Sequence, residues 1–229
     1  MTKVSIIIPA FNEEKRIEKT LKNIALVFKN ETETIVISNG STDKTIEILK
    51  SWKSKNVDFK YLDFSQKLGK GGAIIEGLKI AKGEIVGFID ADDAFDLGYI
   101  KQKLEELNQV DCIIASKWKN QNFFQVDEPF LRKLLSRGWN LLVRVLLNLQ
   151  YKDTQAGAKF FRKGVRDRIG ANFISKDFAF DVDLLKKIKG NNFRIKEIYV
   201  PSKFIEGSTF RLKHCKTMFK DLIKIWRSN

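Results

Sequence analysis

The sequence predicts a three-layer α/β fold, in which helices cover both faces of a mostly parallel, mixed central sheet. Short apolar segments alternate with segments of helical periodicity through the first 90 residues, which is typical of βαβ units. The 229 residues are 43% hydrophobic, enough for one well-packed domain. With only 3 prolines and 14 glycines, no Ser/Gly/Pro tract and no internal repeat, the chain shows no inter-domain linker.

The first half opens with a predicted strand–turn–helix unit. Residues 4–9 (Val-Ser-Ile-Ile-Ile-Pro) form a nearly continuous apolar run, which suits a strand buried on both faces. Apolar residues then recur at helical spacing from Ile17 to Phe28. The following elements are predicted as strands at 34–37, 59–62 and 84–90 and as helices around 46–49 and from about 71 to 80.

Polar residues follow three of these strands. Asn12, Asn39 and Asp90 each come after an apolar run, at the carboxyl end of a predicted strand. In open α/β sheets, ligands bind in the crevice beyond those ends. The sequence therefore predicts one crevice that collects all three side chains.

The second half predicts further strands and two long amphipathic segments. The strands are expected at 111–116, 156–161 and 195–200, and a long helix at 130–149. A basic amphipathic helix is expected at 211–229, after a main domain covering residues 1–210.

Three carboxylates stand at the end of the fourth predicted strand. Asp90 and Asp92 are two residues apart, so they point to the same side of an extended chain, and Asp93 follows. Two convergent carboxylates can hold Mg²⁺ or Mn²⁺, with diphosphate oxygens as the remaining ligands. The alternative is a polar loop with an aspartate that caps the next helix.

The cysteines and the hydropathy indicate a cytoplasmic protein. Cys112 and Cys215 form no disulfide framework and have no metal-ligand spacing, which suits a reducing compartment. Met1 leads within a few residues into the first predicted strand, so no signal peptide is expected. No segment approaches the ~20 apolar residues that span a bilayer.

The net charge of +14 calls for an anionic partner. The helix at 130–149 combines a thin polar stripe, including Arg137 and Arg144, with a wide apolar surface, which favours an interfacial membrane helix. The segment at 211–229 repeats the pattern, so we expect peripheral association with an anionic membrane surface. The alternative is ordinary packing of an amphipathic helix on the sheet. No nucleic-acid-binding motif is present, and nucleic acid is not expected as a partner.

Several motifs resemble the family-2 glycosyltransferases with the GT-A fold. They are Phe11-Asn12-Glu13-Glu14, Asn39-Gly40-Ser41-Thr42-Asp43, Leu68-Gly69-Lys70-Gly71-Gly72-Ala73 and Asp90-Ala91-Asp92. The blocks Asp153-Thr154-Gln155-Ala156-Gly157-Ala158-Lys159-Phe160-Phe161 and Phe178–Leu185 are similar to a narrower branch, the dolichyl-phosphate glucosyltransferases and mannosyltransferases. The resemblance runs from about residue 3 to about residue 210.

The resemblance implies an enzyme that moves a hexose from a nucleotide sugar to a polyprenyl phosphate, with inversion at the anomeric carbon. It also implies a donor site, in which Asp92 contacts the metal and Lys70 faces the phosphates. An anionic acceptor phosphate needs positioning more than deprotonation, and the only histidine, His214, is distant in sequence from every motif. The implied donor-site residues are Pro9, Phe11, Glu13, Asn39, Lys70, Asp90, Ala91 and Asp92.

Other residues receive roles that remain more open. Asp181 and Asp183 are expected to bind sugar hydroxyls, to orient the acceptor or merely to cap a helix. Asp153, Gln155 and Lys159 belong to the most specific motif, but no role is assigned to them. The candidates for the acceptor phosphate and lipid are Arg132, Arg137, Arg144, Lys203, Ser208 and Arg211, with plain surface charge as the alternative.

One departure from the family bears on the donor. Ser38 and Asn39 stand where two aspartates are usual, which leaves the nucleotide open. Asp93-Ala94 favours the glucosyl branch and hence UDP-glucose, with GDP-mannose as the alternative. A transferase acting on a soluble glycan or protein acceptor, and a non-catalytic nucleotide-sugar-binding protein, are the other hypotheses.

Overall fold

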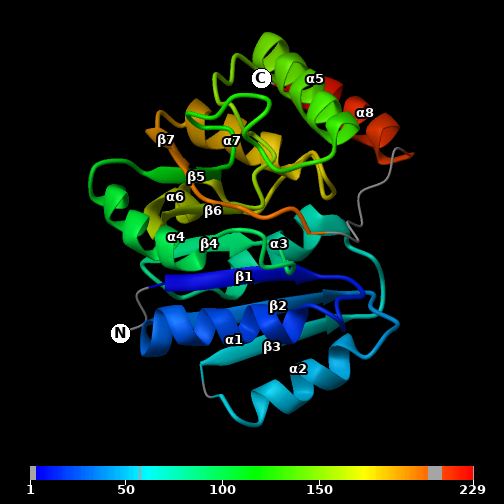
Figure 1. Ribbon diagram of the computed structural model, residues 1–229, viewed down its shortest axis with the longest axis vertical. Coiled ribbons are helices and arrows are strands. Elements are labelled where there is room, and N and C mark those ends of the chain that lie inside the picture. Colours follow the sequence, from blue (N-terminus) through cyan, green and yellow to red (C-terminus); the bar gives the residue numbers. More distant parts are fainter. Residues whose placement is uncertain (1–3, 57, 206–212, 229) are drawn as a thin grey trace.

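A seven-stranded sheet forms the centre of the protein in the computed structural model, which describes residues 4–56, 58–205 and 213–228. The strand order is β3-β2-β1-β4-β6-β5-β7 (Figure 1), and β6 runs antiparallel to both of its neighbours. The other strand pairs are parallel, so the predicted mixed sheet is confirmed. The strands are β1 (Val4–Ala10), β2 (Thr32–Asn39), β3 (Phe59–Phe64), β4 (Ile85–Ile89), β5 (Cys112–Ser116), β6 (Ala158–Arg162) and β7 (Ile195–Tyr199).

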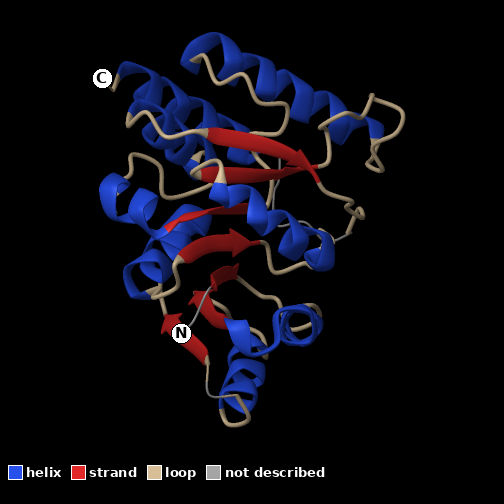
Figure 2. Cartoon of the chain, turned by 90° about the vertical axis from the view of Figure 1, so that its left-hand side faces the viewer, coloured by secondary structure: helices blue, strands red, loops and turns tan. Residues whose placement is uncertain are grey.

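Helices cover both faces of this sheet (Figure 2). The apolar core is split accordingly, since alternate residues of a strand point to opposite faces. On β1, Ile6 and Ile8 join the core under α1, α2 and α4, whereas Ile7 joins the core under α3, α6 and α7. These helices are α1 (Ile17–Phe28), α2 (Thr45–Lys53), α3 (Gly69–Ile80), α4 (Leu97–Lys103), α6 (Lys163–Ile169) and α7 (Phe180–Gly190), with short 3₁₀ turns at Lys29–Glu31 and Leu104–Asn108.

Two further helices lie at the β7 end of the sheet (Figures 1 and 2). They are α5 (Phe130–Leu147) and α8 (Lys213–Arg227), and Val143 of α5 and Leu222 of α8 share a small third core with Ile114 of β5. The predicted long helix at 130–149 is thus present, two residues shorter. In the described part of the chain no helix is long and apolar enough to cross a membrane.

Every strand predicted from the sequence is present, with ends that differ by a few residues. Two short helices, α4 and α6, were not predicted, because segments of seven residues carry too little periodicity to be recognised. What matters for function is the parallel arrangement of β1, β2 and β4. It brings their carboxyl ends to one edge, next to α5 and α8.

Candidate active site

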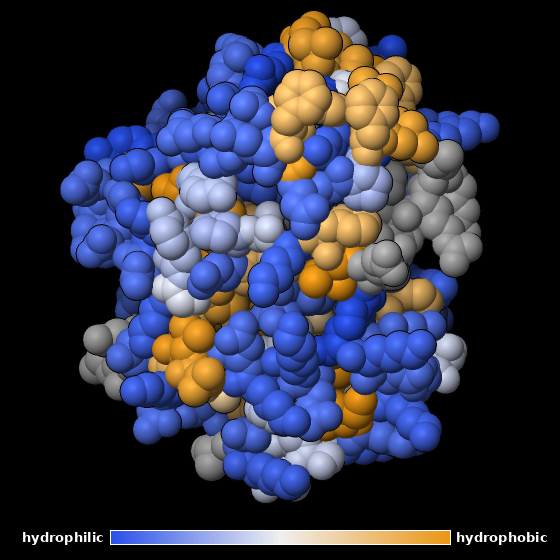
Figure 3. All heavy atoms as spheres, in the orientation of Figure 1, coloured by the Kyte–Doolittle hydropathy of each residue, from blue (hydrophilic) through white to orange (hydrophobic). Residues whose placement is uncertain are grey.

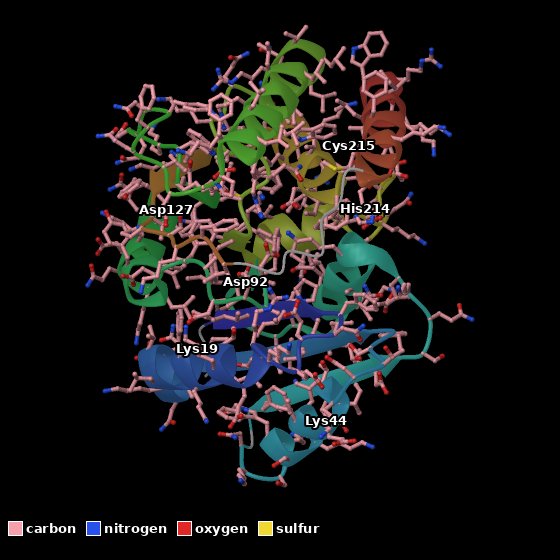
Figure 4. The ribbon with its side chains drawn as sticks, turned by 45° about the vertical axis from the view of Figure 1, so that its right-hand side comes forward. Lys19, Lys44, Asp92, Asp127, His214 and Cys215 are labelled. Carbon is pink, nitrogen blue, oxygen red and sulfur yellow. The ribbon has the colours of Figure 1, made fainter. Side chains whose placement is uncertain are left out.

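A cleft of about 1560 Å³ lies at that edge of the sheet. Its floor is the loops after β1 and β4, its sides are the start of α3 and the segment before α7, and its remaining wall is α5 and α8. Figure 4 shows Asp92 near the middle of the molecule and His214 and Cys215 at the start of α8. All of the predicted donor-site residues line this cleft, namely Pro9, Phe11, Glu13, Asn39, Lys70, Asp90, Ala91 and Asp92.

The backbone around Asp90 and Asp92 is fixed from both sides. The Asp90 N–H donates to the carbonyl of Gly157 (2.9 Å), and the Thr20 hydroxyl donates to the carbonyl of Ala91 (2.8 Å). A Cβ on Gly157 would lie 2.2 Å from Oδ2 of Asp90, so only glycine fits beside this carboxylate. The strand end and the geometry of the 153–161 motif therefore depend on each other.

The third carboxylate of the cluster points elsewhere. Asp93 has a positive φ of 58°, and its side chain accepts a hydrogen bond from Asn23 (2.7 Å) and pairs with Lys19 (3.3 Å). Asp93 does not line the cleft. Asp90 and Asp92 are thus the two carboxylates of the cluster that line the cleft.

Charges alternate along a chain of four side chains behind the pair. Lys70 lies 2.8 Å from Asp90 and 3.6 Å from Asp181, and Asp181 in turn lies 2.5 Å from Lys159. Burial lowers the pKa of Lys70, but the carboxylates of Asp181 and Asp90 outweigh it, so this pKa is raised and the side chain is cationic. Lys159, 0% exposed, also donates to the carbonyl of Ala156 and acts as an internal anchor for Asp181.

Asp92 carries a negative charge that the protein leaves poorly compensated. Burial and then the neighbouring Asp90 raise the pKa of Asp92. The pKa of Glu13 is also raised by burial, against the effect of Arg16, which it binds through both carboxylate oxygens (2.7 and 2.9 Å). Excess carboxylate charge of this kind is what a divalent cation stabilises.

The donor set suits a metal that the protein shares with its ligand. Within the described residues, no group of three or more histidine, cysteine or acidic side chains is placed to hold a metal ion. Mg²⁺ is commonly bound by one or two carboxylates together with substrate phosphates. Asp90 and Asp92 therefore fit a divalent cation whose other ligands come from a diphosphate.

Two predicted roles change in the structure. The amide oxygen of Asn39 accepts the backbone N–H of Leu68, which occupies one of its two lone pairs, and the amide N–H₂ can donate to a base as well. The glycines at positions 69, 71 and 72, in the first turn of α3, serve close packing. Gly69 has φ of +79° and lies against the Lys176 carbonyl, to which Gly72 donates its N–H (2.8 Å). The expected set of free N–H groups for phosphate is reduced accordingly.

The two aspartates of α7 differ sharply. Asp181 takes part in the charge chain, whereas Asp183 accepts the backbone N–H groups of Ile174 (2.5 Å) and Ser175 (3.1 Å). Asp183 is buried and does not line the cleft, so it holds the 174–175 segment. Asp183 thus binds a neighbouring segment and caps no N–H of α7, and of the two aspartates only Asp181 contacts a cleft residue, Lys70.

The predicted acceptor residues also separate. Arg132 lines the cleft and pairs with Glu128 (3.2 Å). Arg137 and Arg144 do not line it, because they turn inward and donate to the carbonyls of Lys152 and Tyr151. Lys203 is exposed outside the cleft, and Ser208 and Arg211 lie outside the described residues.

Several cleft residues were missed in the sequence. Lys117 follows β5 and pairs with Glu128 (2.8 Å), so the strand-end rule that identified Asp90 would also have found it. His214, expected far from every motif, lies on the cleft wall with its ring 4.9 Å from that of Phe178. Nothing in its sequence neighbourhood signals this position, which arises from the packing of α8.

Comparisons with known proteins agree with the fold and the motifs. The model of the family described as Glycosyl transferase family 2 matches residues 5–170. The chain is 29% identical to a dolichyl-phosphate beta-glucosyltransferase of Trichomonas vaginalis, over 97% of this chain and 72% of that protein. A dolichyl-phosphate beta-glucosyltransferase of Homo sapiens is also 29% identical, over 90% and 68% of the two chains.

Solved structures resemble the fold at low identity. Glucosyl-3-phosphoglycerate synthase from Mycobacterium tuberculosis, in complex with uridine diphosphate, superposes with a TM-score of 0.74 at 18% identity and covers 99% of this chain and 79% of that one. The same enzyme with Mn²⁺, UDP-glucose and phosphoglyceric acid gives a TM-score of 0.72 at 17% identity, with the same coverage. At this identity the likeness concerns the fold.

The matched residues 5–170 include β1 to β6 and the Asp90/Asp92 pair. The family model covers well over half of the chain, and the relatives in the narrower branch align with nearly all of it. The protein is therefore a member of glycosyl transferase family 2 with the GT-A fold, close to the dolichyl-phosphate beta-glucosyltransferases.

Proposed function

We propose that this protein is an inverting, metal-dependent glucosyltransferase that moves glucose from UDP-glucose to dolichyl phosphate or a related polyprenyl phosphate at the cytoplasmic face of a membrane. One observation carries the proposal. A single cleft has a pair of carboxylates on its floor and an exposed apolar helix, α5, as its wall. The names of the aligned relatives support the acceptor, and the UDP-glucose complex of a fold neighbour supports the donor.

The donor would lie across the carboxyl ends of β1, β2 and β4. Phe11, under the ammonium group of Lys67 (4.1 Å), and the amide N–H₂ of Asn39 border the nucleoside side. A uracil carbonyl accepts from such an amide, which suits UDP. Asp90 and Asp92 would hold Mg²⁺ or Mn²⁺ together with the diphosphate. The cation would supply neutralisation of the charge that develops on the departing UDP.

The acceptor would enter from the α5 side, where Lys117 and Arg132 flank Glu128. An oxygen of the acceptor phosphate would attack the anomeric carbon as the bond from that carbon to UDP breaks. A phosphate monoester is already anionic at neutral pH, so no proton must be removed. Asp181 is tied to Lys159 and Lys70, and it would position Lys70 rather than act as a base.

The outer face of α5 supports a membrane surface as the second partner. Large apolar side chains that a water-facing helix would not display are exposed there, and Figure 3 shows hydrophobic residues gathered at the top of the view over α5 and α8. Exposed basic residues of α8 flank this surface, and each would add on the order of 1 kcal/mol near anionic lipid. They are Lys216, Lys220, Lys224 and Arg227.

A donor and acceptor screen tests the proposal. Purified protein is incubated with radiolabelled UDP-glucose or GDP-mannose, vesicles containing dolichyl phosphate, and Mg²⁺, Mn²⁺ or EDTA. The expected result is label in the organic phase from UDP-glucose, lost with EDTA. If label appears from GDP-mannose and not from UDP-glucose, GDP-mannose is the donor in place of UDP-glucose. If no label enters the organic phase under any metal condition, the lipid is not the acceptor. Labelling of an added soluble glycan would then support a transferase that acts on a soluble acceptor.

A further inference from the structure

Buried polar atoms without a partner cluster on one side of the cleft. Among the described residues, ten buried side-chain nitrogen and oxygen atoms have no hydrogen-bond partner, and eight of them belong to residues between 118 and 155. Native proteins leave few such atoms, because each one costs desolvation free energy. The eight belong to Trp118, Glu128, Arg137, Trp139, Asn140, Asp153, Thr154 and Gln155.

Three of these residues line the cleft and stand outside the contacts described so far. Asp153 has an unpartnered Oδ2 although its side chain is almost fully buried, and Gln155 and Trp139 have unpartnered N–H groups. The backbone N–H of Asp153 is held by Glu197 (2.7 Å), so the loop itself is well anchored. The unpartnered side-chain atoms are thus positioned, and their lack of partners is not due to a loose loop.

Their place in the chain puts them beside the carboxylate pair. Gln155 is two residues before Gly157, whose carbonyl accepts the Asp90 N–H and whose Cα packs on the Asp90 carboxylate. Trp139 of α5 lines the same cleft and packs against the small core that contains Ala156, the neighbour of Gln155. A group attached to a diphosphate at Asp90 and Asp92 would lie in the cleft that these side chains line.

The chemistry of the three groups is mixed. A carboxylate oxygen only accepts, and the amide and indole N–H groups only donate. A hydroxyl does both, so a ring bearing several hydroxyls complements the whole set, whereas a phosphate would accept from the two N–H groups but leave the carboxylate oxygen without a donor, and an alkyl chain would satisfy none of the three. We propose that Asp153, Gln155 and Trp139 form the subsite for the hexose of the donor and determine which sugar is transferred. This inference rests on the proposed function, and it assigns the selection of the sugar to residues for which that function needs no role.

The test compares a nucleotide with and without its sugar. Binding of UDP and of UDP-glucose to the full chain is measured by calorimetry with Mg²⁺, for the wild type and for Asp153→Asn, Gln155→Leu and Trp139→Phe. We expect each variant to weaken UDP-glucose at least tenfold and UDP less than twofold, because only the sugar contacts are lost. The preference for UDP-glucose over UDP-galactose in turnover should fall by a similar factor.

The matched control is Thr154→Val. Thr154 lies between Asp153 and Gln155 and also has an unpartnered buried hydroxyl, but it does not line the cleft. This variant should keep both affinities and the sugar preference. If Asp153→Asn fails to fold, Gln155→Leu and Trp139→Phe decide the matter, since both side chains are only partly buried.

The outcomes distinguish failure of the hexose subsite from failure of the proposed glucosyltransferase function. Variants that weaken UDP and UDP-glucose equally, or that keep the affinity for UDP-glucose and the preference over UDP-galactose, would overturn the hexose subsite while leaving the glucosyltransferase proposal intact. A wild-type protein that binds no nucleotide sugar would overturn the proposed function and the subsite together.

Discussion

Helices α1 and α5 are both amphipathic, but they turn their apolar faces in opposite directions. The apolar residues of α1 that face the sheet, such as Leu21 and Ile24, are at most 2% exposed. On α5, Phe130, Leu141 and Val145 are 61 to 73% exposed, and Asn140 is buried instead. Helical periodicity therefore identifies which residues share a face, whereas the elements packed around the helix decide whether that face turns inward.

The inward polar stripe of α5 has a specific task. Arg137 and Asn140 donate to the carbonyl of Lys152, and Arg144 donates to that of Tyr151. Buried backbone carbonyls need such donors. The stripe therefore fixes the loop that leads into Asp153 and Gln155, and the apolar face remains free for another partner.

The largest effect is expected at the floor of the cleft, where the Thr20 hydroxyl of α1 holds the carbonyl of Ala91. Asp92→Asn should lower kcat by on the order of 10³-fold, since the divalent cation loses a charged ligand. Asp93→Asn is the matched control, because Asp93 binds Asn23 and Lys19 outside the cleft, and it should stay within a few-fold of the wild type. Equal losses in the two variants would contradict the assignment of the pair.

The same substitution, leucine to serine, made in α1 and in α5 measures how much the apolar face of each helix contributes to stability. Leu21→Ser should reduce the free energy of unfolding by about 3 kcal/mol or more, because it removes a buried side chain and places a hydroxyl in the core. Leu141→Ser, at a position 61% exposed, should change it by less than about 0.5 kcal/mol. Urea titration of both variants measures this, and a large loss for Leu141→Ser would show that α5 needs its apolar face for folding.

A smaller effect is expected where the 153–161 motif meets the strand end. Gly157→Ala should lower kcat/KM by about 10- to 100-fold, since the added methyl group displaces the Asp90 carboxylate. Gly164→Ala in α6 is the control, because no atom lies within 4 Å of its added Cβ, and it should keep full activity. An active Gly157→Ala protein would show that the position of Asp90 is not critical.

The smallest effect concerns pH. Burial raises the pKa of Asp153, so the folded state disfavours the ionised carboxylate. Stability from this group is greatest near and below the unfolded pKa and falls as pH rises through the folded pKa. Asp153→Asn lacks that loss. Its free energy of unfolding relative to the wild type should therefore be higher at pH 7 than at pH 4. The opposite trend in urea titrations would contradict the buried-charge interpretation.

The sequence predicts the sheet well, and the side chains expected at its strand ends do line one cleft, because both follow from local patterns. Asp90 and Asp92 stand at the end of an apolar run, and the carboxyl end of a parallel strand lies at the cleft, so both side chains line it. The sequence predicts poorly which side chains of α5 and α8 reach the cleft. Arg137 and Arg144 looked like ligands for phosphate, yet they bind loop carbonyls, and His214 reaches the cleft only through the packing of α8. These contacts depend on which long-range partner each helix finds, and periodicity carries no such information.

The most direct test of the central claim, that one cleft joins a sugar donor to a membrane-held phosphate, is a ratio of two rates. Transfer from UDP-glucose is measured to dolichyl phosphate in anionic vesicles and to a short, water-soluble prenyl phosphate, for the wild type and for Leu141→Ser/Val145→Ser. The predicted result is a loss of about tenfold with vesicles and an unchanged rate with the short acceptor. Equal rates for the two proteins on both acceptors would contradict the membrane role of α5, and no transfer by the wild type to either acceptor would contradict the claim itself.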